Sequence, residues 1–273
     1  MSVHCLAQDR DIGASCPPRQ LCFFPSVQDS LRWWELYEQL PGLDSTYAAT
    51  ADDVDREESV RVTGILITFS DSVLNGCPHV ALAVAYRSAA DVLQLEQTEK
   101  SIRYFEKAVE RLHALYPCET HMGNAITADL TKLYSNTGEL EQAHNLGKEN
   151  LPRMQNMPVV DSGKLAFQHF WLGVTSRKLY QENDALAHFH AVTDLRRALG
   201  DSTGLSESLS WLGSTLDAVG RYREAEDALF EYLAVTEALY APLSEAVIRA
   251  RSDLADHYYS TAQINRADQL VQD

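Results

Sequence analysis

The sequence predicts an all-α protein built from stacked helix hairpins, and three observations carry this prediction. The 273 residues are rich in the helix-favouring residues Ala, Leu, Glu, Gln and Arg, and glycine is sparse. Small residues recur at Ser101, Ala143, Ala185, Ala225 and Ala267, and the alanines are spaced 42, 40 and 42 residues apart. Large residues and turn positions recur in step with this alanine series. A fixed period of this length is typical of solenoids made of helix pairs.

Four further columns accompany the alanine series and give it a mechanical meaning. The column four residues later is mostly large, with Phe105, Gly147, Phe189, Leu229 and Val271. The column thirteen residues earlier is mostly leucine, with Ser88, Leu130, Leu172, Leu212 and Leu254. Each of those is followed by a small residue, namely Ala89, Thr131, Gly173, Gly213 and Ala255, and a turn column holds Gly138, Tyr180, Gly220 and Ala262. Small residues let two helices approach closely, and stacked pairs bury a core that one pair cannot bury alone.

The elements are expected in the following order. Residues 1–28 mix Pro, Asp, Cys and Gln without periodicity and are expected to form a flexible N-terminal arm. Residues 29–77 are expected to form an N-terminal helical cap, with one amphipathic helix after Asp29-Ser30 and a second over about 57–75. The acidic stretch 52–58 is interpreted as a solvated linker that leads into the second of these helices.

The remaining residues, 78–273, are expected to form the repeat domain. The five repeats are placed at about 78–118, 119–160, 161–200, 201–242 and 243–273. The helix pairs are placed at 79–95 with 98–116, 121–137 with 139–156, 162–179 with 182–199, 202–219 with 222–240, and 244–261 with 264–272. Asp201-Ser202 and Ser244 have the side chains that cap helix N-termini.

These columns resemble the tetratricopeptide repeat (TPR), W-x2-L-G-x2-Y…A-x3-F…P. The copy that fits best runs from Leu209 through Leu212-Gly213 to Leu216, and continues with Gly220, Tyr222, Ala225 and Leu229. The period is longer than the common one of about 34 residues and is similar to that of kinesin light chains and LGN-type scaffolds. The resemblance implies a right-handed superhelical α-solenoid of about five helix pairs with an N-terminal helical cap.

Composition and motifs argue against several other classes of protein. The formal charge of −16 and the pI near 4.9 disfavour binding to nucleic acid and to anionic membranes. No run of apolar residues is long enough for a transmembrane helix. The five cysteines are odd in number and form no CxxC, which favours free thiols and a cytoplasmic location.

Catalytic and metal sites are not expected. The sequence has no GxxxxGK[ST], GxGxxG, HExxH or GxSxG motif, so we expect no enzyme activity and no cofactor. His188 and His190 are two residues apart and would point to different sides of a helix, so they are not expected to share a metal. His169 is expected to be a packed histidine whose ring nitrogen forms a local hydrogen bond.

By the resemblance, the first helix of each pair lines a concave groove that holds a partner segment. The residues that fall on these positions include Tyr86, Lys132, Asn136, Phe167, Phe170, Arg177, Lys178, Ser210, Asp217, Arg249 and Tyr259, together with Ser214, Ser252 and Asp256. Phe167 and Phe170 are either binding anchors or core residues. Lys132, Arg177, Lys178 and Arg249 favour an acidic partner segment, unless they are ordinary scattered surface charges.

The function expected from these observations is that of a non-catalytic scaffold or adaptor that binds another protein. A subunit of a larger cytoskeletal or axonemal assembly fits the same residues. A peptide-sensing regulator is the alternative, although residues 1–76 offer at most two helices and no basic recognition helix. The last repeat has no polar capping helix after it, so we expect that this end docks on a partner or on another copy, or that the chain is a fragment of a longer protein.

Overall fold

The computed structural model of the chain describes residues 24, 26–39, 53–74, 80–93, 97–116 and 118–272, and the regular elements of these residues are α-helices. The prediction of an all-α fold is therefore confirmed. The chain divides into two compact units, one made of Met1–Leu133 with Asn156–Val159 and the other of Tyr134–Gln155 with Val160–Asp273. The expected domain boundaries at residues 28 and 77 stay predictions.

The first unit contains α2 (Val27–Tyr37), α4 (Asp53–Leu74), α5 (Val80–Leu93), α6 (Thr98–Leu115) and most of α7 (His121–Thr137). Trp33 and Leu66 are fully buried where α2 packs on α4. The indole Nε1 of Trp33 donates a hydrogen bond of 3.0 Å to Oγ of Ser70, so the buried polar atom is satisfied. The two helices expected for residues 29–77 are therefore both present.

The acidic stretch at 52–58 differs from its expected structure. Helix α4 begins at Asp53, so most of this stretch lies inside the first turns of the helix and not in a linker. Carboxylates near a helix N-terminus interact favourably with the helix dipole, and this explains why an acidic segment can be helical here.

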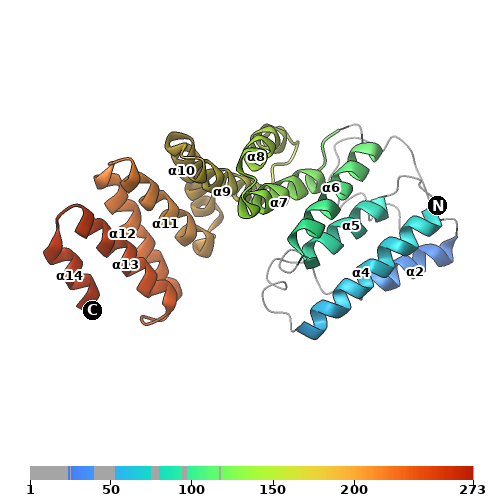
Figure 1. Cartoon of the computed structure of the whole chain (residues 1–273), viewed down its shortest axis with the longest axis horizontal. Helices are drawn as coiled ribbons and strands as arrows, with labels where there is room; N and C mark the ends of the chain where they lie inside the picture. The colour runs from blue at the N-terminus through green and yellow to red at the C-terminus, as the bar shows by residue number, and fades with distance from the viewer. Residues whose placement is uncertain are drawn as a thin grey trace. The chain divides into compact units, whose positions relative to one another are not determined.

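The second unit contains the last turn of α7 and then α8 (Leu140–Gln155), α9 (Ser162–Lys178), α10 (Glu182–Leu199), α11 (Ser202–Ala218), α12 (Tyr222–Leu239), α13 (Glu245–Ser260) and α14 (Ile264–Gln272). Figure 1 shows α9 with α10, α11 with α12, and α13 with α14 as successive antiparallel pairs. The side chains of Asp201 and Ser244 accept hydrogen bonds from backbone N–H groups three residues later, as predicted, and Asp161 caps α9 in the same way.

The alanine series forms the centre of these pairs. Ala143, Ala185, Ala225 and Ala267 are all fully buried. Ser101 is also buried, and its Oγ donates a hydrogen bond of 2.7 Å to the carbonyl oxygen of Ala90 on the partner helix. The column therefore marks the helix–helix contact in each hairpin.

The glycines before the turns permit the close approach that the sequence predicts. A Cβ atom on Gly173 would lie 2.7 Å from the ring of Phe189, and one on Gly213 would lie 2.6 Å from Leu229. Real Cβ atoms do not approach other atoms so closely, so the first and second helices could not pack in this way with larger residues.

All four residues of the turn column adopt a left-handed backbone conformation. The φ angles are 91° at Gly138, 59° at Tyr180, 78° at Gly220 and 58° at Ala262. Glycine tolerates this conformation, whereas residues with a Cβ atom adopt it at a cost. Tyr180 and Ala262 therefore occupy a backbone conformation that is unfavourable for a residue with a Cβ atom.

The helices of the second unit form two layers. Among the first helices, Phe170 of α9 contacts Trp211 of α11, and Ser210 of α11 bonds to Asp253 of α13. Among the second helices, Arg197 of α10 forms an ion pair with Glu231 of α12, with 3.0 Å between Nη2 and Oε1. One layer thus consists of α9, α11 and α13, and the other of α10 and α12.

Candidate partner-binding surface

The first helices of the three pairs are α9, α11 and α13. We use the term first-helix face for the side of these helices that does not pack against the second helices and whose side chains are exposed or half-exposed. It consists of Phe167, Arg177, Lys178, Glu207, Ser210, Ser214, Asp217, Arg249, Ser252, Asp253, Asp256 and Tyr259. Most of these side chains were predicted from the repeat register. The face belongs to the second unit alone.

Phe170 is not part of this face, although it was predicted as a possible anchor. Its side chain is 3% exposed, so the structure selects the core interpretation. The ring contacts Phe189 and Trp211 edge-on, with centroid distances of 6.3 and 6.4 Å. The guanidinium of Arg196 lies over the ring at 4.7 Å from its centroid. Phe167 is half-buried and keeps part of its ring on the first-helix face.

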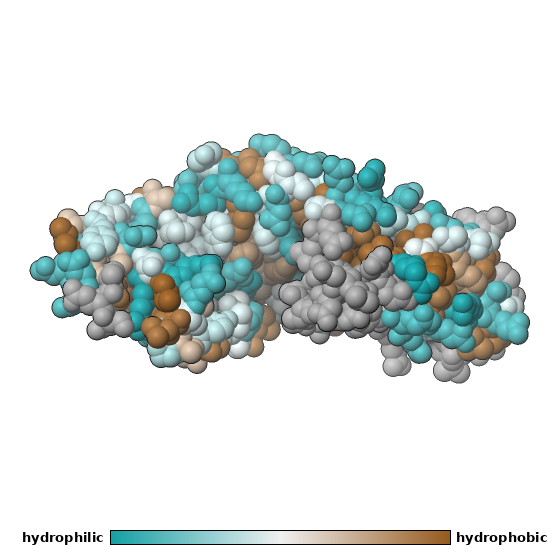
Figure 2. All heavy atoms as spheres, turned by 60° about the horizontal axis from the view of Figure 1, so that its bottom comes forward, coloured by the Kyte–Doolittle hydropathy of each residue, from teal (hydrophilic) through white to brown (hydrophobic). Residues whose placement is uncertain are grey.

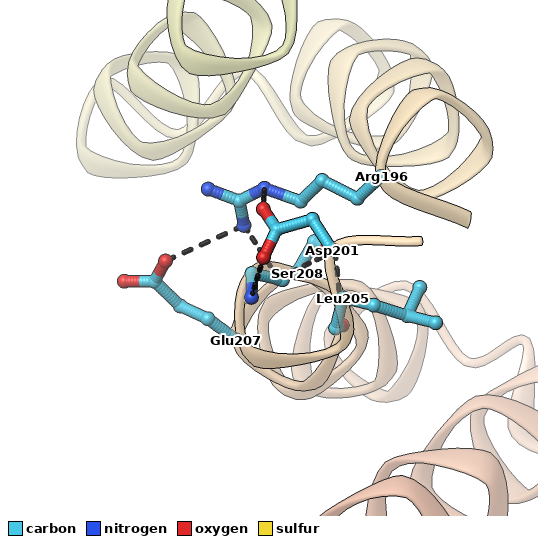
Figure 3. A network of polar contacts seen from close by, with 6 residues as sticks. Arg196, Asp201, Leu205, Glu207 and Ser208 are labelled. Atoms are coloured by element: carbon cyan, nitrogen blue, oxygen red, sulfur yellow. Dashed lines mark hydrogen bonds and ion pairs between the residues drawn. The ribbon is translucent and has the colours of Figure 1, made fainter. Parts of the chain in front are cut away.

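Arg196 links Phe170 to the start of α11. Its side chain is only 9% exposed, and Nη1 donates a hydrogen bond of 2.6 Å to the carbonyl oxygen of Gly204. Figure 3 shows the guanidinium between Asp201 and Glu207, and the ion-pair distances are 3.9 and 3.3 Å. Burial lowers the pKa of Arg196, and the two carboxylates oppose that effect. The buried cation therefore holds three elements together and places the Glu207 carboxylate on the first-helix face.

Tyr86 is also a core residue and not a surface contact. It lies in the first unit and is 4% exposed. Its hydroxyl donates a hydrogen bond of 3.3 Å to Asp71, and Nζ of Lys107 lies 5.3 Å from the ring centroid. Burial raises the pKa of Tyr86, and the Asp71 charge raises it further. Lys132 belongs to the first unit as well and is half-buried.

The cations predicted to attract an acidic partner are engaged within the chain. Arg177 Nη1 lies 3.2 Å from the Glu182 carboxylate. Lys178 Nζ donates a hydrogen bond of 2.7 Å to the carbonyl oxygen of Ser135, which brings the end of α7 and the exposed Asn136 next to α9. Arg249 Nη2 lies 2.6 Å from the Glu245 carboxylate one turn earlier. Burial lowers the pKa of Lys178.

The polar residues on α11 and α13 are joined across the layer. Ser210 Oγ donates to Asp253 Oδ2 at 3.2 Å, and Asp217 Oδ1 lies 2.7 Å from Nδ1 of the buried His257. These contacts fix the carboxylates of the two helices on one surface.

Tyr259 and Asp268 make a similar contact beside them. The exposed Tyr259 donates through its hydroxyl to Asp268 Oδ1 at 2.9 Å. The hydrogen bond ties the ring to α14 and leaves it part of the first-helix face.

Three histidines contact α9 or belong to it, and two of them, His169 and His188, contact each other. Nδ1 of His169 lies 3.1 Å from Nδ1 of His188 on α10, so one ring donates and the other accepts. The bond of His169 is therefore between helices and not within its own helix. Burial lowers the pKa of His169, and burial together with the neighbouring His169 lowers the pKa of His188 to about 4. His144 Nδ1 lies 3.5 Å from Ser176 Oγ, and its pKa is lowered by burial.

Two further results concern metal and cysteine chemistry. Among the described residues, no three or more His, Cys, Asp or Glu side chains are grouped so that they could hold a metal ion. Cys118 is disulfide-bonded, so the expectation of free thiols is wrong for this residue. The cytoplasmic location stays a prediction.

Glu207 and Asp253 were missed by the sequence-based choice of residues. Glu207 lies 40 residues after Phe167, so the repeat period alone would have placed it on the same face. Asp253 lies next to the buried Leu254 in a position where the two preceding repeats have Trp171 and Trp211. The repeat register would therefore have shown an aspartate at this position of the last repeat.

Figure 2 shows the residues of one side of the molecule by hydropathy, and apolar residues lie there in separate patches among hydrophilic ones. No helix of the described residues is both long and apolar enough to cross a membrane.

No family model matches the sequence, and no curated protein is similar to it. Solved structures are similar in fold at low sequence identity. BtubC (BKLC) from P. vanneervenii has 16% identity and a TM-score of 0.67, over 80% of this chain and 88% of that chain. A kinesin light chain with nearly identical TPR-like repeats from Podosopora anserina has 16% identity and a TM-score of 0.62, over 71% of this chain and 93% of that chain. The chain has the fold of TPR-like repeat proteins.

The TPR-like fold is shared with a neighbour that was solved with a bound molecule. A Rap protein complexed with competence and sporulation factor has 14% identity and a TM-score of 0.56, over 90% of this chain and 75% of that chain. These neighbours agree with the resemblance drawn from the alanine series and with the long repeat. Similarity at this level of identity concerns the fold.

Proposed function

We propose that the protein is a non-catalytic scaffold that binds a segment of a partner protein on its first-helix face. The observation that carries the proposal is the composition of this face over three successive repeats. Ser210, Ser214 and Ser252 place short polar side chains on α11 and α13, and larger polar or aromatic ones flank them. Short side chains leave room for those of a partner, and the flanking groups can bond to it.

The packing of the helices in two layers also supports binding at the first-helix face. The second helices α10 and α12 cover the opposite side of the first helices, and the core between the layers is closed by Phe189, Leu229 and the alanine series. The first helices therefore stay rigid while their other side remains accessible. A rigid, pre-formed surface loses little conformational entropy when it binds a partner.

A peptide-sensing regulator is the second candidate. The Rap protein with bound competence and sporulation factor matches 90% of this chain, including residues before the clear repeats. In that case the bound segment would be a free peptide, and the first-helix face would still hold it. A structural subunit of a larger cytoskeletal or axonemal assembly is a further version of the scaffold role.

Affinity capture with matched variants tests the proposal. Ser214→Trp and Ser252→Trp add bulk to exposed positions of the first helices, and Asp227→Trp adds the same bulk to the exposed side of α12. We expect the first two variants to lower partner recovery at least about tenfold, because a buried steric clash costs more than about 1.4 kcal/mol. The Asp227→Trp variant should recover partners like the wild type.

Melting temperatures of the three variants serve as the folding control. Equal recovery by all variants, or an equal loss with Asp227→Trp, would contradict binding at the first-helix face. The test uses exposed positions because Phe170→Ala would remove a core side chain and confound binding with stability.

A further inference from the structure

The charge of the first-helix face on α11 and α13 is predominantly negative. Four carboxylates lie there, namely Glu207, Asp217, Asp253 and Asp256. The exposed cation beside them is Arg249, which is ion-paired with Glu245. Arg251 and Arg266 pair with Glu237 and Glu226 of α12, so these two guanidiniums are held against the second helix layer.

Asp253 and Asp256 are not neutralised by any cation in direct contact among the described residues. Asp253 accepts a hydrogen bond from the neutral hydroxyl of Ser210. Burial raises the pKa of Asp253 and the charge of Asp256 raises it further, while the hydrogen bond from Ser210 and the charge of Arg249, which makes no direct contact, oppose this. Asp256 is exposed. A cation from outside the chain would therefore stabilise both carboxylates.

An exposed aromatic ring lies beside these carboxylates. Tyr259 follows Asp256 by three residues, which places both on one side of α13. The ring is held by the hydrogen bond from its hydroxyl to Asp268. A carboxylate next to an aromatic face suits a Lys or Arg side chain, because the ring attracts a cation and the carboxylate pairs with it.

We propose that the α11–α13 part of the first-helix face takes a basic segment of the partner protein, with Lys or Arg side chains placed against Asp253, Asp256 and Tyr259. The inference rests on the proposed function and adds the chemistry of the partner. It reverses the acidic partner that the sequence favoured, because the cations behind that expectation are already bonded within the chain. Ser210, Ser214 and Ser252 provide the space in which long basic side chains can lie.

Peptide binding to the full chain tests this inference. The probes are three fluorescein-labelled peptides of equal length with the same apolar positions and with Lys, Gln or Glu at the polar positions. Fluorescence anisotropy gives the Kd of each at low and at near-physiological salt. We expect the Lys peptide to bind at least about tenfold more tightly than the Glu peptide, with the Gln peptide between them.

Matched charge reversals separate a local site from the general attraction of a protein of charge −16. Asp256→Lys and Asp227→Lys change the net charge equally, but Asp227 lies on the exposed side of α12. We expect Asp256→Lys to weaken the Lys peptide about tenfold and Asp227→Lys to weaken it less than about twofold. Asp256→Asn should weaken it about threefold.

Several outcomes would overturn the inference. Tightest binding of the Glu peptide would show an acidic partner, and an equal effect of Asp256→Lys and Asp227→Lys would show non-specific attraction. Failure of the Lys peptide to bind would also count against it. If Lys and Gln peptides bind equally and both are lost in Ser214→Trp, the basic preference is wrong while the proposed function stands. If binding is insensitive to Ser214→Trp, the proposed function itself is wrong.

Discussion

Tyr180 lies in the turn between α9 and α10 with a φ of 59°, and its side chain is 85% exposed. Its ring gains little from packing, while its backbone occupies a conformation that costs about 1 kcal/mol for a residue with a Cβ atom. The equivalent turns at Gly138 and Gly220 avoid this cost.

We therefore expect Tyr180→Gly to raise the free energy of unfolding by about 0.5–1 kcal/mol, since glycine removes the backbone strain but gains entropy in the unfolded chain. Urea unfolding of the full chain measures the change. Gly220→Ala is the opposite control and should lower stability by about 1–2 kcal/mol. A loss of stability in Tyr180→Gly would show that the ring makes a contact that outweighs the strain.

The histidines of α8, α9 and α10 predict a dependence of stability on pH. Both histidines of the 3.1 Å pair have lowered pKa values in the folded chain, and that of His188 is about 4. The groups that face His188 are His169, His144, Lys148 and Asp184, and only the last favours its charged form. The unfolded chain therefore binds protons below about pH 6.5 that the folded chain does not.

The sign follows from this difference. Stability is complete above pH 6.5 and falls as the pH decreases toward 4, because protonation then favours the unfolded chain. We expect the difference in unfolding free energy between the wild type and His188→Gln to change by roughly 2 kcal/mol between pH 7 and pH 4.5. Denaturant unfolding at both values measures it. A difference that does not change with pH would show that the pKa of His188 is the same in the folded and the unfolded chain.

At the scale of elements, Arg196 is the main polar link between α10 and α11. Removal of its side chain would leave the carbonyl oxygen of Gly204 without its donor and the Phe170 ring without its cation. We expect Arg196→Ala to lower the free energy of unfolding by about 2–4 kcal/mol.

Arg197→Ala is the matched control for that prediction. Arg197 is about half-exposed, and it pairs with Asp194 and Glu231 on the surface. The cost of its removal should be below about 1 kcal/mol. Thermal and urea unfolding compare the two variants, and equal losses would contradict a special role for the buried guanidinium.

The glycines of the first helices test the packing of the hairpins. A Cβ atom on Gly213 would lie 2.6 Å from Leu229, whereas one on Gly64 in α4 would meet no atom within 4 Å. Gly213→Ala should therefore lower stability by about 1–3 kcal/mol through overpacking. Gly64→Ala should raise it by up to about 1 kcal/mol through helix propensity. Opposite signs in urea unfolding are the expected result, and stabilisation by Gly213→Ala would show that the hairpins are packed more loosely.

The elements were the most predictable level of this molecule. The alanine series and its companion columns placed the helices of the second unit within about two residues of their observed ends. The helix ends could be predicted because small residues at helix contacts and glycines in turns depend on their near neighbours in the sequence. Helix α4 began earlier than expected, because an acidic stretch at a helix start reads like a linker in sequence.

The candidate surface was less predictable than the helices. The repeat register found Ser210, Asp217, Arg249 and Tyr259, because side-chain direction follows from helical periodicity. It could not show that Phe170 and Tyr86 are buried, since both depend on partners from other helices, such as Arg196 and Lys107. The acidic partner segment stays a prediction, and three of the cations that favoured it are bonded within the chain.

At the scale of the whole molecule, the second helices cover one side of the first helices, and we propose that the other side of the first helices binds the partner. Helix pairs that contact only their neighbours can present a long surface without a change in the core. The first-helix face gathers its polar, acidic and aromatic side chains from successive repeats, so no single repeat would suffice for binding.

Site-specific photo-crosslinking tests this claim most directly. A photoreactive amino acid replaces Ser214 on α11 in one form of the full chain and Asp227 on α12 in another, and both positions are exposed. We predict that irradiation with bound partner yields a covalent adduct from position 214 and none from position 227. Adducts from position 227, or from both positions equally, would contradict binding at the first-helix face.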